Sequence, residues 1–554
     1  MRLFYIFVLL LILNILNALS IEDVYLYLKS TDNGIYSKYE NVTYSKPSMN
    51  YLPSDWLFQT PNGWGYTIDQ LNLSRTHGSL PLDSTWNLPI CQNDNDCIQP
   101  AVCKEALFSN DKRLLCQTGS YNLLNQFSNL ISSANYTVDV IHYDNSNNVD
   151  SIFTQALEVS LKKLAQKSID ENKTIYVRFL KGVQIPSGFS VKNFILTLST
   201  LKDFILKITK DLPNGNHLVL SVANMESCYI INNCFKFKNL LFLFSFNHGK
   251  LINVDNNILF TGNSNYTDDY LLYNPVIDID IKIQGPILLY ANTFTNIIWN
   301  YVSKNKFLSL NQCFTYQNNQ ITNDCLDNIP FPPISNNNPP NVNTMFVATY
   351  GTNVISSDTD QSEMARVYAV YNAKSIVRIV QQAVDIIGYK DFNKVFFPNT
   401  TLDYNFPVPN IIAAMAYDIT RNVDVYITTS SLTSTSSDTY SSFVSNQYIY
   451  NQIFNNIRVL EPNMSDSLIK TLLNSKLHLS TIAFTPNDPK VGITSLHAKF
   501  WMVDDQVFYI GSHNIYPTNL QEFGLVLDSS TFATQLIQQW WNPLWDNSTK
   551  FVNQ

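Results

Sequence analysis

Two stretches, nearly half the chain apart, decide how this sequence is interpreted. The first reads HGKLINVD over residues 248–255, and the second reads HAKFWMVD over residues 497–504. Both have the pattern His-x-Lys-x4-Asp, and both continue through a short turn and an apolar run to Gly-x-x-Asn, at 262–265 and 511–514. One such motif is a weak signal, whereas two copies with the same continuation indicate an internal duplication.

The spacing within each motif predicts how its side chains are presented. Residues i and i+2 of a strand point to the same face, so His248 projects with Lys250, and His497 with Lys499. Across a shared site, two lysines can bind the non-bridging oxygens of a phosphodiester, while one imidazole attacks phosphorus and the other protonates the leaving alkoxide. The competing interpretation is a pair of structural His–Asp contacts in repeated strands, but buried lysines are a costly way to build a core.

The motifs and their continuations resemble the phospholipase D superfamily, whose signature is this duplication. The pattern is most similar to the secreted bacterial phospholipases D, which match residues 497–524 and also the stretches DDYL at 268–271 and NPVIDID at 274–280. The similarity runs from about residue 63 to about residue 545. It is strong at the two motifs and loose between them.

The resemblance implies a two-step mechanism with a covalent intermediate. His248 would be the nucleophile that forms a phosphohistidine, and His497 would be the general acid and later the base that activates water. Lys250 and Lys499 would bind the phosphate. Because the lysines supply the positive charge, the mechanism needs neither a metal nor another cofactor.

The resemblance also implies roles for acidic residues. Asp255 and Asp504 mainly hold their motifs together in such enzymes. The carboxylates that orient the two imidazoles, and so fix their tautomers, match Asp278 and Glu522, each a short way past its own motif. Asp280 is a close competitor for the role of Asp278.

Two asparagines complete the implied site. Asn265 and Asn514 would be further hydrogen-bond donors to phosphate. The first motif departs from the bacterial enzymes, because Gly262-Asn263 stands where they have paired glycines. Asn265 also begins an Asn-x-Thr sequon, and a glycan there would block the site. We therefore expect Asn265 to be buried and unmodified.

Strands and helices alternate outside the motifs, which is typical of an α/β fold. In the first half we expect strands at 138–143, 175–180, 217–222 and 235–246 and helices at 152–166 and 194–209. In the second half we expect helices at 376–387, with Gly388 as C-cap, and 411–419, and strands at 394–398, 423–428 and 457–460. The expected fold has two pseudo-symmetric halves, each a mixed β-sheet flanked by helices, packed to share one central active site.

These patterns also suggest boundaries along the chain. They predict a signal peptide (1–20), a Cys-bearing N-terminal region (21–118), a first half with motif 248–255 (119–334), an Asn/Pro-rich connector (335–345) and a second half with motif 497–504 (346–554).

Three features predict entry into the secretory pathway. Arg2 precedes an apolar run, and small residues at Ala18 and Ser20 suit signal-peptide cleavage. The eight cysteines favour short disulfides, with Cys228–Cys234 and Cys313–Cys325 as the expected pairs and the pairing of the first four left open. Eight sequons predict a glycoprotein, at Asn41, Asn72, Asn135, Asn172, Asn265, Asn399, Asn463 and Asn547.

Composition narrows the choice of substrate. With 45% hydrophobic and 14% charged residues, the chain has a globular composition, and no later segment is apolar over a membrane-spanning length. A net charge of −8 and the absence of a dense Lys/Arg run do not favour nucleic acid. We expect an exported phospholipase D that hydrolyses phospholipids such as phosphatidylcholine at a membrane surface. A nuclease on the same fold and an inactive lipid-binding glycoprotein are the alternatives.

Overall fold

The computed structural model describes most of the chain. The described residues are 18–31, 39–61, 63–74, 81, 88–106, 113–141, 151–182, 201–228, 245–266, 276–305, 311–335, 338–351, 354–355, 360–385, 410–430, 444–486, 495–515 and 520–552. Several predictions lie outside these residues: most of the signal peptide, the strand at 394–398, most of the strand at 235–246, and the Cys228–Cys234 pair.

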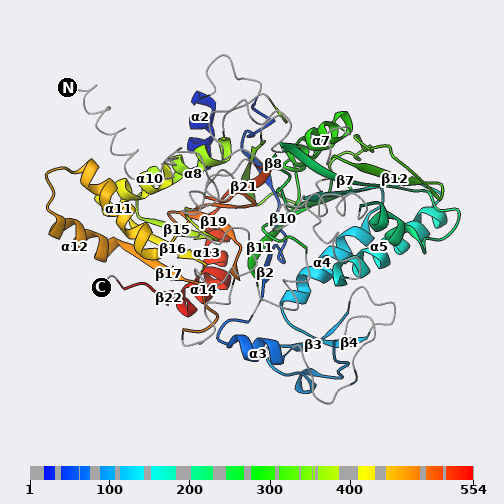
Figure 1. Ribbon diagram of the computed structural model, residues 1–554, viewed down its shortest axis with the longest axis horizontal. Helices are drawn as coiled ribbons and strands as arrows, with labels where there is room; N and C mark the ends of the chain where they lie inside the picture. Colours follow the sequence, from blue (N-terminus) through cyan, green and yellow to red (C-terminus); the bar gives the residue numbers. More distant parts are fainter. Residues whose placement is uncertain are drawn as a thin grey trace, which may run out of the picture.

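Two large mixed sheets form the framework of the molecule (Figure 1). The strands of the first-half sheet are β2 (Leu57–Thr60), β5 (Thr137–Ile141), β6 (Ile175–Gly182), β7 (Leu218–Cys228), β8 (Ser245–Phe246), β9 (Leu251–Val254), β10 (Ile258–Gly262), β11 (Val276–Ile283), β12 (Cys313–Gln317), β13 (Gln320–Thr322) and β18 (Ser495–Leu496). Their order is β13-β12-β7-β6-β5-β9-β10-β11-β18, with β2 paired to β11 and β8 to β7.

The second-half sheet repeats this plan. Its strands are β1 (Ser48–Asn50), β14 (Val342–Thr349), β15 (Ile376–Gln381), β16 (Asp424–Thr429), β17 (Leu477–Thr481), β19 (Lys499–Val503), β20 (Val507–Gly511), β21 (Glu522–Asp528) and β22 (Thr549–Lys550). Their order is β1-β14-β21-β20-β19-β15-β16-β17-β22. Three parallel strands, β5-β6-β7 or β15-β16-β17, are followed by three antiparallel ones, β9-β10-β11 or β19-β20-β21. The pseudo-symmetric α/β fold expected from the sequence is confirmed.

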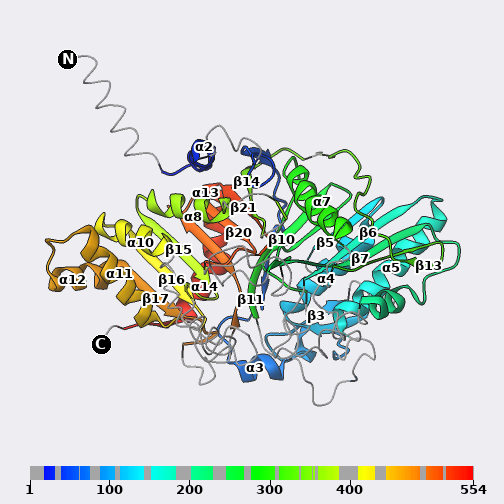
Figure 2. The same ribbon diagram turned by 45° about the horizontal axis from the view of Figure 1, so that its top comes forward.

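Helices pack against both faces of the sheets (Figure 2). Those of the first half are α4 (Ser120–Ser133), α5 (Ile152–Asp170), a helical segment at 201–209, and α7 (Leu288–Lys304). Those of the second half are α8 (Gln361–Tyr371), α10 (Asn410–Thr420), α11 (Asn446–Leu460), α12 (Asp466–Lys476), α13 (Ser530–Leu536), a π-helical turn (Ile537–Trp541) and α14 (Asn542–Asn547). Of these, α7, α13, the π-helical turn and α14 contribute to the central cluster between the sheets, and the others cover the outer faces. Among the described residues, no helix combines the length and apolar character needed to cross a bilayer.

The core forms three layers because the motif strands are buried on both faces. Leu251 points into a central cluster between the sheets, whereas the next residue, Ile252, points into the cluster under α4 and α5. In the second half Met502 points into the same central cluster and Trp501 points towards α8 and α10. The alternation of side chains along a strand thus joins the two halves through one shared apolar layer.

The aspartate that ends each motif sits in a tight hairpin turn. Asp255 and Asn256 have φ of 52°, and Asp504 and Asp505 have φ of 53°, a left-handed conformation that Asp and Asn tolerate. The Asp255 carboxylate accepts the backbone N–H groups of residues 135–137, at the start of β5. Asp504 accepts those of residues 374–376, at the start of β15. Each aspartate therefore fastens its hairpin to the neighbouring strand.

Two predicted elements of the second half are wrong. Residues 376–381 form β15, a central strand, and not the first part of a helix over 376–387. All residues of Ile376-Val-Arg-Ile-Val380 except Arg378 are β-branched, and apolar side chains lie on both faces of the strand, so their spacing satisfied a helical period by coincidence. Residues 457–460 are the end of α11 and not a strand, because the helix capped by Ser445 continues through them.

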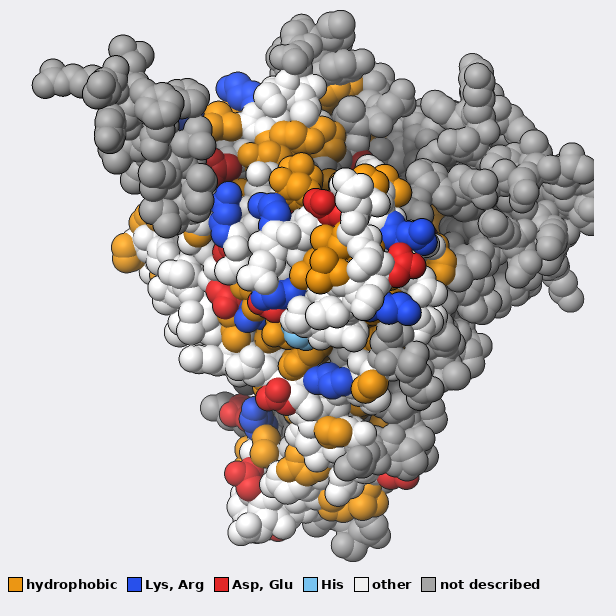
Figure 3. Space-filling view, turned by 90° about the vertical axis from the view of Figure 1, so that its left-hand side faces the viewer, with side chains coloured by type: hydrophobic (Ala, Val, Ile, Leu, Met, Phe, Trp, Pro, Cys, Tyr) orange, Lys and Arg blue, Asp and Glu red, His pale blue; other side chains and the backbone are white. Residues whose placement is uncertain are grey.

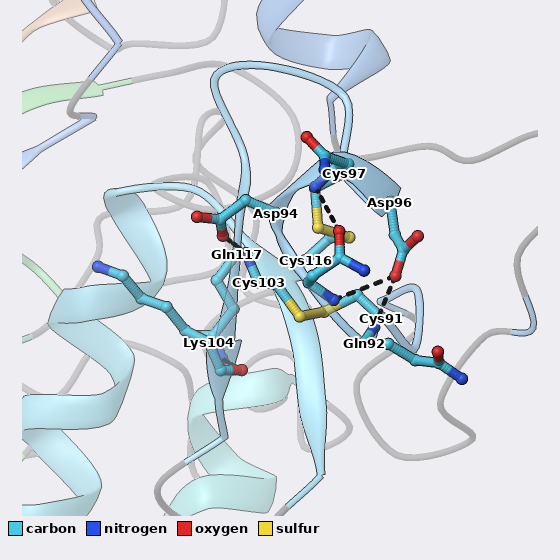
Figure 4. The surroundings of a disulfide bond; sticks show 11 residues. Cys91, Gln92, Asp94, Asp96, Cys97, Cys103, Lys104, Cys116 and Gln117 are labelled. Atoms are coloured by element: carbon cyan, nitrogen blue, oxygen red, sulfur yellow. Dashed lines mark hydrogen bonds between the residues drawn. A yellow bond between two sulfur atoms is a disulfide. The ribbon is translucent and has the colours of Figure 1, made fainter.

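The N-terminal region contributes to both sheets through β1 and β2, and α2 (Ile21–Thr31) packs beside α8. It also carries α3 (Ile68–Leu73), a 3₁₀ turn (Asp94–Asp96) and a two-stranded sheet of β3 (Val102–Glu105) and β4 (Leu114–Gln117). Two disulfides, Cys91–Cys103 and Cys97–Cys116, cross-link residues 91–116 of this region (Figure 4).

The predicted Cys313–Cys325 disulfide is wrong, because Cys325 keeps a free thiol. The pairing of Thr315 with Thr322 in the β12–β13 hairpin sets the register. Continued outward, this register places residue 324 opposite Cys313, one position before Cys325. A one-residue offset turns a side chain towards the opposite face of a sheet.

Candidate active site

Each motif histidine is held by the backbone of the opposite half. The His248 N–H donates to the carbonyl of Gln521 at 2.9 Å, in the segment that leads into β21. The His497 N–H donates to the carbonyl of Ile277 at 3.0 Å, in β11, beside the pairing of β18 with that strand. At the centre of the molecule, each half therefore contributes a backbone segment that hydrogen-bonds to the other half.

These contacts bring the two imidazoles together edge to face. The ring centroids of His248 and His497 lie 6.4 Å apart, with an angle of 76° between the ring planes. The side chains of Lys250 and Lys499 are fully buried beside them. The Lys250 ammonium donates to the carbonyl of His248 at 2.9 Å, and Lys499 donates likewise to His497. Two buried cations thus flank two closely spaced imidazoles.

A buried carboxylate from the other half holds each imidazole. Glu522 contacts His248 Nδ1, with its two oxygens at 3.0 and 2.9 Å. Asp278 contacts His497 Nδ1 at 3.0 Å. Asp280, the competitor of Asp278, faces the turn after β10 instead. In both imidazoles the carboxylate engages Nδ1, which leaves Nε2 as the nitrogen that can react.

Burial shapes the electrostatics of this centre. Desolvation first, and then the charges of Lys250 and Lys499, lower the pKa values of both His248 and His497 well below the ordinary range. Burial raises the pKa of Glu522 to about 7, although nearby positive groups and the Ser512 hydroxyl act to lower it. The lowered pKa favours the neutral imidazole that a nucleophile requires, whereas the other imidazole must carry a proton on Nε2 to act as an acid.

Sequence comparison places the second motif in a known family. A family model described as "Cardiolipin synthase, PLD-like domain" matches residues 400–545. Phospholipase D from Streptomyces antibioticus is 24% identical over 343 residues, which cover 55% of this chain and 59% of that protein. Both matches support membership of the phospholipase D superfamily. The chain spans less than two thirds of the length of this curated relative.

Three solved structures show partial similarity to the chain. Phosphatidylserine synthase from Haemophilus influenzae Rd KW20 gives a TM-score of 0.48 at 12% identity, covering 78% of this chain and 86% of that one. Nuc from Salmonella typhimurium gives 0.23 at 18% identity, covering 38% and 99%. NucT from Helicobacter pylori gives 0.22 at 15% identity, covering 33% and 89%.

The remaining residues that the superfamily pattern implicates lie at different distances from the imidazoles. Asp255 and Asp504 lie at the far ends of their hairpins, across β9 and β19 from the histidines. Asn514 is buried and Asn265 is partly buried. Among the described residues, no hydrogen bond reaches the side-chain oxygen of either asparagine.

Sequence reasoning missed three neighbours of the centre. Ser512 donates its hydroxyl to Glu522 Oε2 at 2.5 Å, and Asn263 donates its amide to the carbonyl of Gly511 in the other half. His513 Nε2 lies 3.2 Å from Asp360, which also caps the N-terminus of α8. All three residues lie within the Gly-x-x-Asn segments, so the sequence does show that they lie near the motifs. It does not show which residues they contact, because those partners are distant in the sequence.

One group of possible metal-binding side chains occurs in the described part of the chain. It consists of Cys91, Cys97 and Cys103, whose sulfur atoms lie close together. All three sulfurs are engaged in the two disulfides.

Proposed function

We propose that this protein is a phospholipase D that hydrolyses phospholipids such as phosphatidylcholine through a phosphohistidine intermediate. The observation that carries the proposal is the pair of imidazoles with centroids 6.4 Å apart, each held at Nδ1 by a buried carboxylate and flanked by a buried lysine. One phosphoryl group would bind between the two rings, with a reacting contact of roughly 3–3.5 Å between phosphorus and His248 Nε2.

In the first step, the Nε2 lone pair of His248 attacks phosphorus and the phosphorus–oxygen bond to the head group breaks. His497 donates its Nε2 proton to the departing oxygen, which leaves as an alcohol. Glu522 stabilises the His248 cation that forms, because it already engages Nδ1 at 2.9 Å. Lys250 and Lys499 bind the non-bridging oxygens, where negative charge develops.

In the second step, His497 Nε2 takes a proton from water while the water oxygen attacks phosphorus. The phosphorus–nitrogen bond then breaks, its electrons return to His248, and phosphatidic acid leaves. A primary alcohol can replace water at this point and yields a phosphatidyl-alcohol. Asn265 and Asn514, which follow β10 and β20, are proposed as further donors to the phosphoryl oxygens.

Two observations support a lipid over a nucleic acid as substrate. The Streptomyces antibioticus relative is named a phospholipase D. The chain carries a net charge of −8, and on the face shown in Figure 3 acidic and basic side chains are interspersed over its described part. Nucleic-acid binders usually present a continuous basic surface.

We also propose that the protein acts after entry into the secretory pathway, as a secreted or lumenal glycoprotein. The disulfides Cys91–Cys103 and Cys97–Cys116 support an oxidising environment. Secretion of the full-length chain from a eukaryotic host, with a new N-terminus near Ile21, is the expected result.

The test is turnover of purified protein with phosphatidylcholine vesicles, with and without ethanol, against a single-stranded oligonucleotide. We expect phosphatidic acid, its partial replacement by phosphatidylethanol, and no cleavage of the oligonucleotide. Activity should survive EDTA, because the two lysines supply the positive charge at the phosphate. Cleavage of the oligonucleotide without turnover of lipid would contradict the lipid substrate and favour a nuclease. Loss on chelation that a specific divalent ion restores would contradict the metal-independent mechanism.

A further inference from the structure

The two half-sites differ at one buried position. Gly262, at the end of β10, pairs with Asp280 of β11, and Gly511, at the end of β20, pairs with Gly524 of β21. Asp280 therefore occupies the place that Gly524 has in the second half. Asp280 is 1% exposed, so a carboxyl group is buried in one half-site where the other has none.

Asp280 binds the turn that follows β10. Its Oδ1 accepts the backbone N–H groups of Asn263 at 3.1 Å and Ser264 at 3.2 Å. Its Oδ2 accepts the Ser264 hydroxyl at 2.5 Å. Three donors on two consecutive residues leave the turn little freedom.

The second half holds the equivalent turn differently. The N–H of His513, the counterpart of Ser264, donates to the hydroxyl of Tyr509 at 3.2 Å. A Cβ atom at Gly524 would lie 2.2 to 2.5 Å from atoms of the Tyr509 side chain, so a side chain cannot be added there without displacing it. The equivalent backbone N–H group thus donates to a carboxylate in the first half and to a phenol hydroxyl in the second.

The contact of Asp280 fixes one peptide group next to His497. The N–H and C=O of a trans peptide point in opposite directions. Because the Ser264 N–H points to Asp280, the Asn263 carbonyl of that peptide points away from it. This carbonyl hydrogen-bonds to His497 and raises the pKa of that imidazole. Asp278 already engages Nδ1, so Nε2 is the ring nitrogen left to donate to it.

We propose that Asp280 is a positioning residue for His497: it clamps the Asn263–Ser264 peptide so that the Asn263 carbonyl supports the protonated imidazole. The second half offers no carboxylate at this position. Asp280 thereby makes the two imidazoles unequal and favours His497 as the one that holds the proton. This consequence for catalysis rests on the proposed function, whereas the clamp itself does not.

Several charged groups act on these two side chains. Burial, with the neighbouring Asp278 behind it, raises the pKa of Asp280 to about 7, while the Ser264 hydroxyl acts to lower it. Burial, and after it the charge of Asp280, raises the pKa of the neighbouring Tyr266. The charged and titratable groups that face His497 come from both halves: Lys250, His248, Asp278, Lys499 and Glu522.

The test is the titration of His497 itself, followed by NMR of histidine-labelled protein and assigned with His497→Gln. In Asp280→Ala, which removes all three acceptor contacts, we expect His497 to titrate lower by roughly one pH unit. In Asp280→Asn, which keeps an acceptor for the turn but loses the charge, we expect a smaller downward shift. The basic limb of the pH profile for kcat/KM should move in the same direction.

The matched control is Tyr509→Phe, which removes the corresponding acceptor from the second turn. It should leave the titration of His497 unchanged. A folded Asp280→Ala protein with wild-type titration of His497 overturns the proposal, and so does an equal shift in Tyr509→Phe. If Asp280→Ala does not fold, Asp280→Asn decides alone, and an unshifted titration there is the contradicting result. The titration needs no turnover, so a failed lipase assay cannot be confused with a failed clamp.

Discussion

The β9–β10–β11 and β19–β20–β21 units share one backbone plan but differ in the side chains behind their imidazoles. His497 is backed by Asp278, with Asp280 two residues further along the same strand. His248 is backed by Glu522, which also accepts the Ser512 hydroxyl. Duplication therefore explains the paired placement of the two imidazoles. Because the two rings are chemically identical, any difference in their proposed roles must come from these neighbouring side chains.

The comparison also shows that neither half contains a complete centre. The carboxylate for each imidazole comes from the opposite half, and so does the backbone carbonyl that holds each histidine N–H. The Asn263 amide adds a further link, to the carbonyl of Gly511. The active centre thus exists only where the two sheets pack together, through the central apolar cluster.

The largest expected effects come from the histidines and separate their roles. His248→Ala and His497→Ala should each lower kcat by at least roughly 10²–10⁴-fold, the usual contribution of acid–base or nucleophilic groups. With a labelled substrate bearing a good leaving group, His497→Ala should still trap phosphoenzyme, and His248→Ala should not. The measurement is protein-bound label resolved on a gel after a quench in alkaline detergent, because the phosphorus–nitrogen bond of phosphohistidine is labile in acid.

His478→Ala is the matched control, because this imidazole lies on β17 and contacts Asp424 at 3.3 Å. It should retain activity. If label accumulates in His248→Ala and not in His497→Ala, the two roles are reversed. If no variant and no wild-type protein traps label, the covalent mechanism is wrong.

The sequence predicts the motif strands, the duplication and the residues of the centre, because their signals are local. It does not predict that Glu522 serves His248 and Asp278 serves His497, since 274 and 219 residues separate the partners. The mistaken helix at 376–387 has another cause. A strand buried on both faces has no alternation, so the period of β15 could not be read from its apolar residues.

The next largest effect tests the orienting carboxylates. Glu522→Gln should lower kcat by roughly 10²-fold or more, because an amide no longer stabilises the His248 cation. Activity of the wild type should rise as pH increases through about 7, where Glu522 ionises. Initial rates between pH 5 and 9 provide the measurement. Equal rates for wild type and Glu522→Gln would exclude an orienting role.

The Glu522 carboxyl should also make the free energy of unfolding depend on pH. This free energy should fall over the pH range in which activity rises. The folded-state pKa of the carboxyl, about 7, lies above the ordinary 4.5, so the folded protein binds the extra proton between these values. The contribution of Glu522 to the free energy of unfolding is therefore full below about pH 4.5 and declines as pH rises through 7. Glu522→Gln should reduce this decline by about 3 kcal/mol at most, measured by urea unfolding at pH 4.5 and pH 8. An unchanged pH dependence would contradict the raised pKa.

A smaller effect is expected at the hairpin turns. Asp255→Asn and Asp504→Asn should each lower the free energy of unfolding by about 1–3 kcal/mol, because each carboxylate accepts several backbone N–H groups at the start of the next strand. Asparagine tolerates the left-handed backbone, so the comparison isolates the charge and its contacts. Urea unfolding measures the change. A loss of turnover as large as that of Glu522→Gln would place these residues in the chemistry instead.

The smallest expected effect is a modification that does not occur. Asn265 begins a sequon, yet it is partly buried, its side-chain oxygen is inaccessible, and it directly follows the turn that Asp280 clamps. Asn135 begins another sequon and is exposed, which makes it the matched comparison within the same half. Glycopeptide mass spectrometry of secreted protein should find Asn265 unoccupied, whatever the occupancy at Asn135. Asn265→Gln should then leave the mass of the glycans unchanged while weakening turnover, since a longer amide misplaces the proposed phosphate donor. High occupancy of Asn265 in active protein would remove it from the site, and with it the equivalence of the two Gly-x-x-Asn segments.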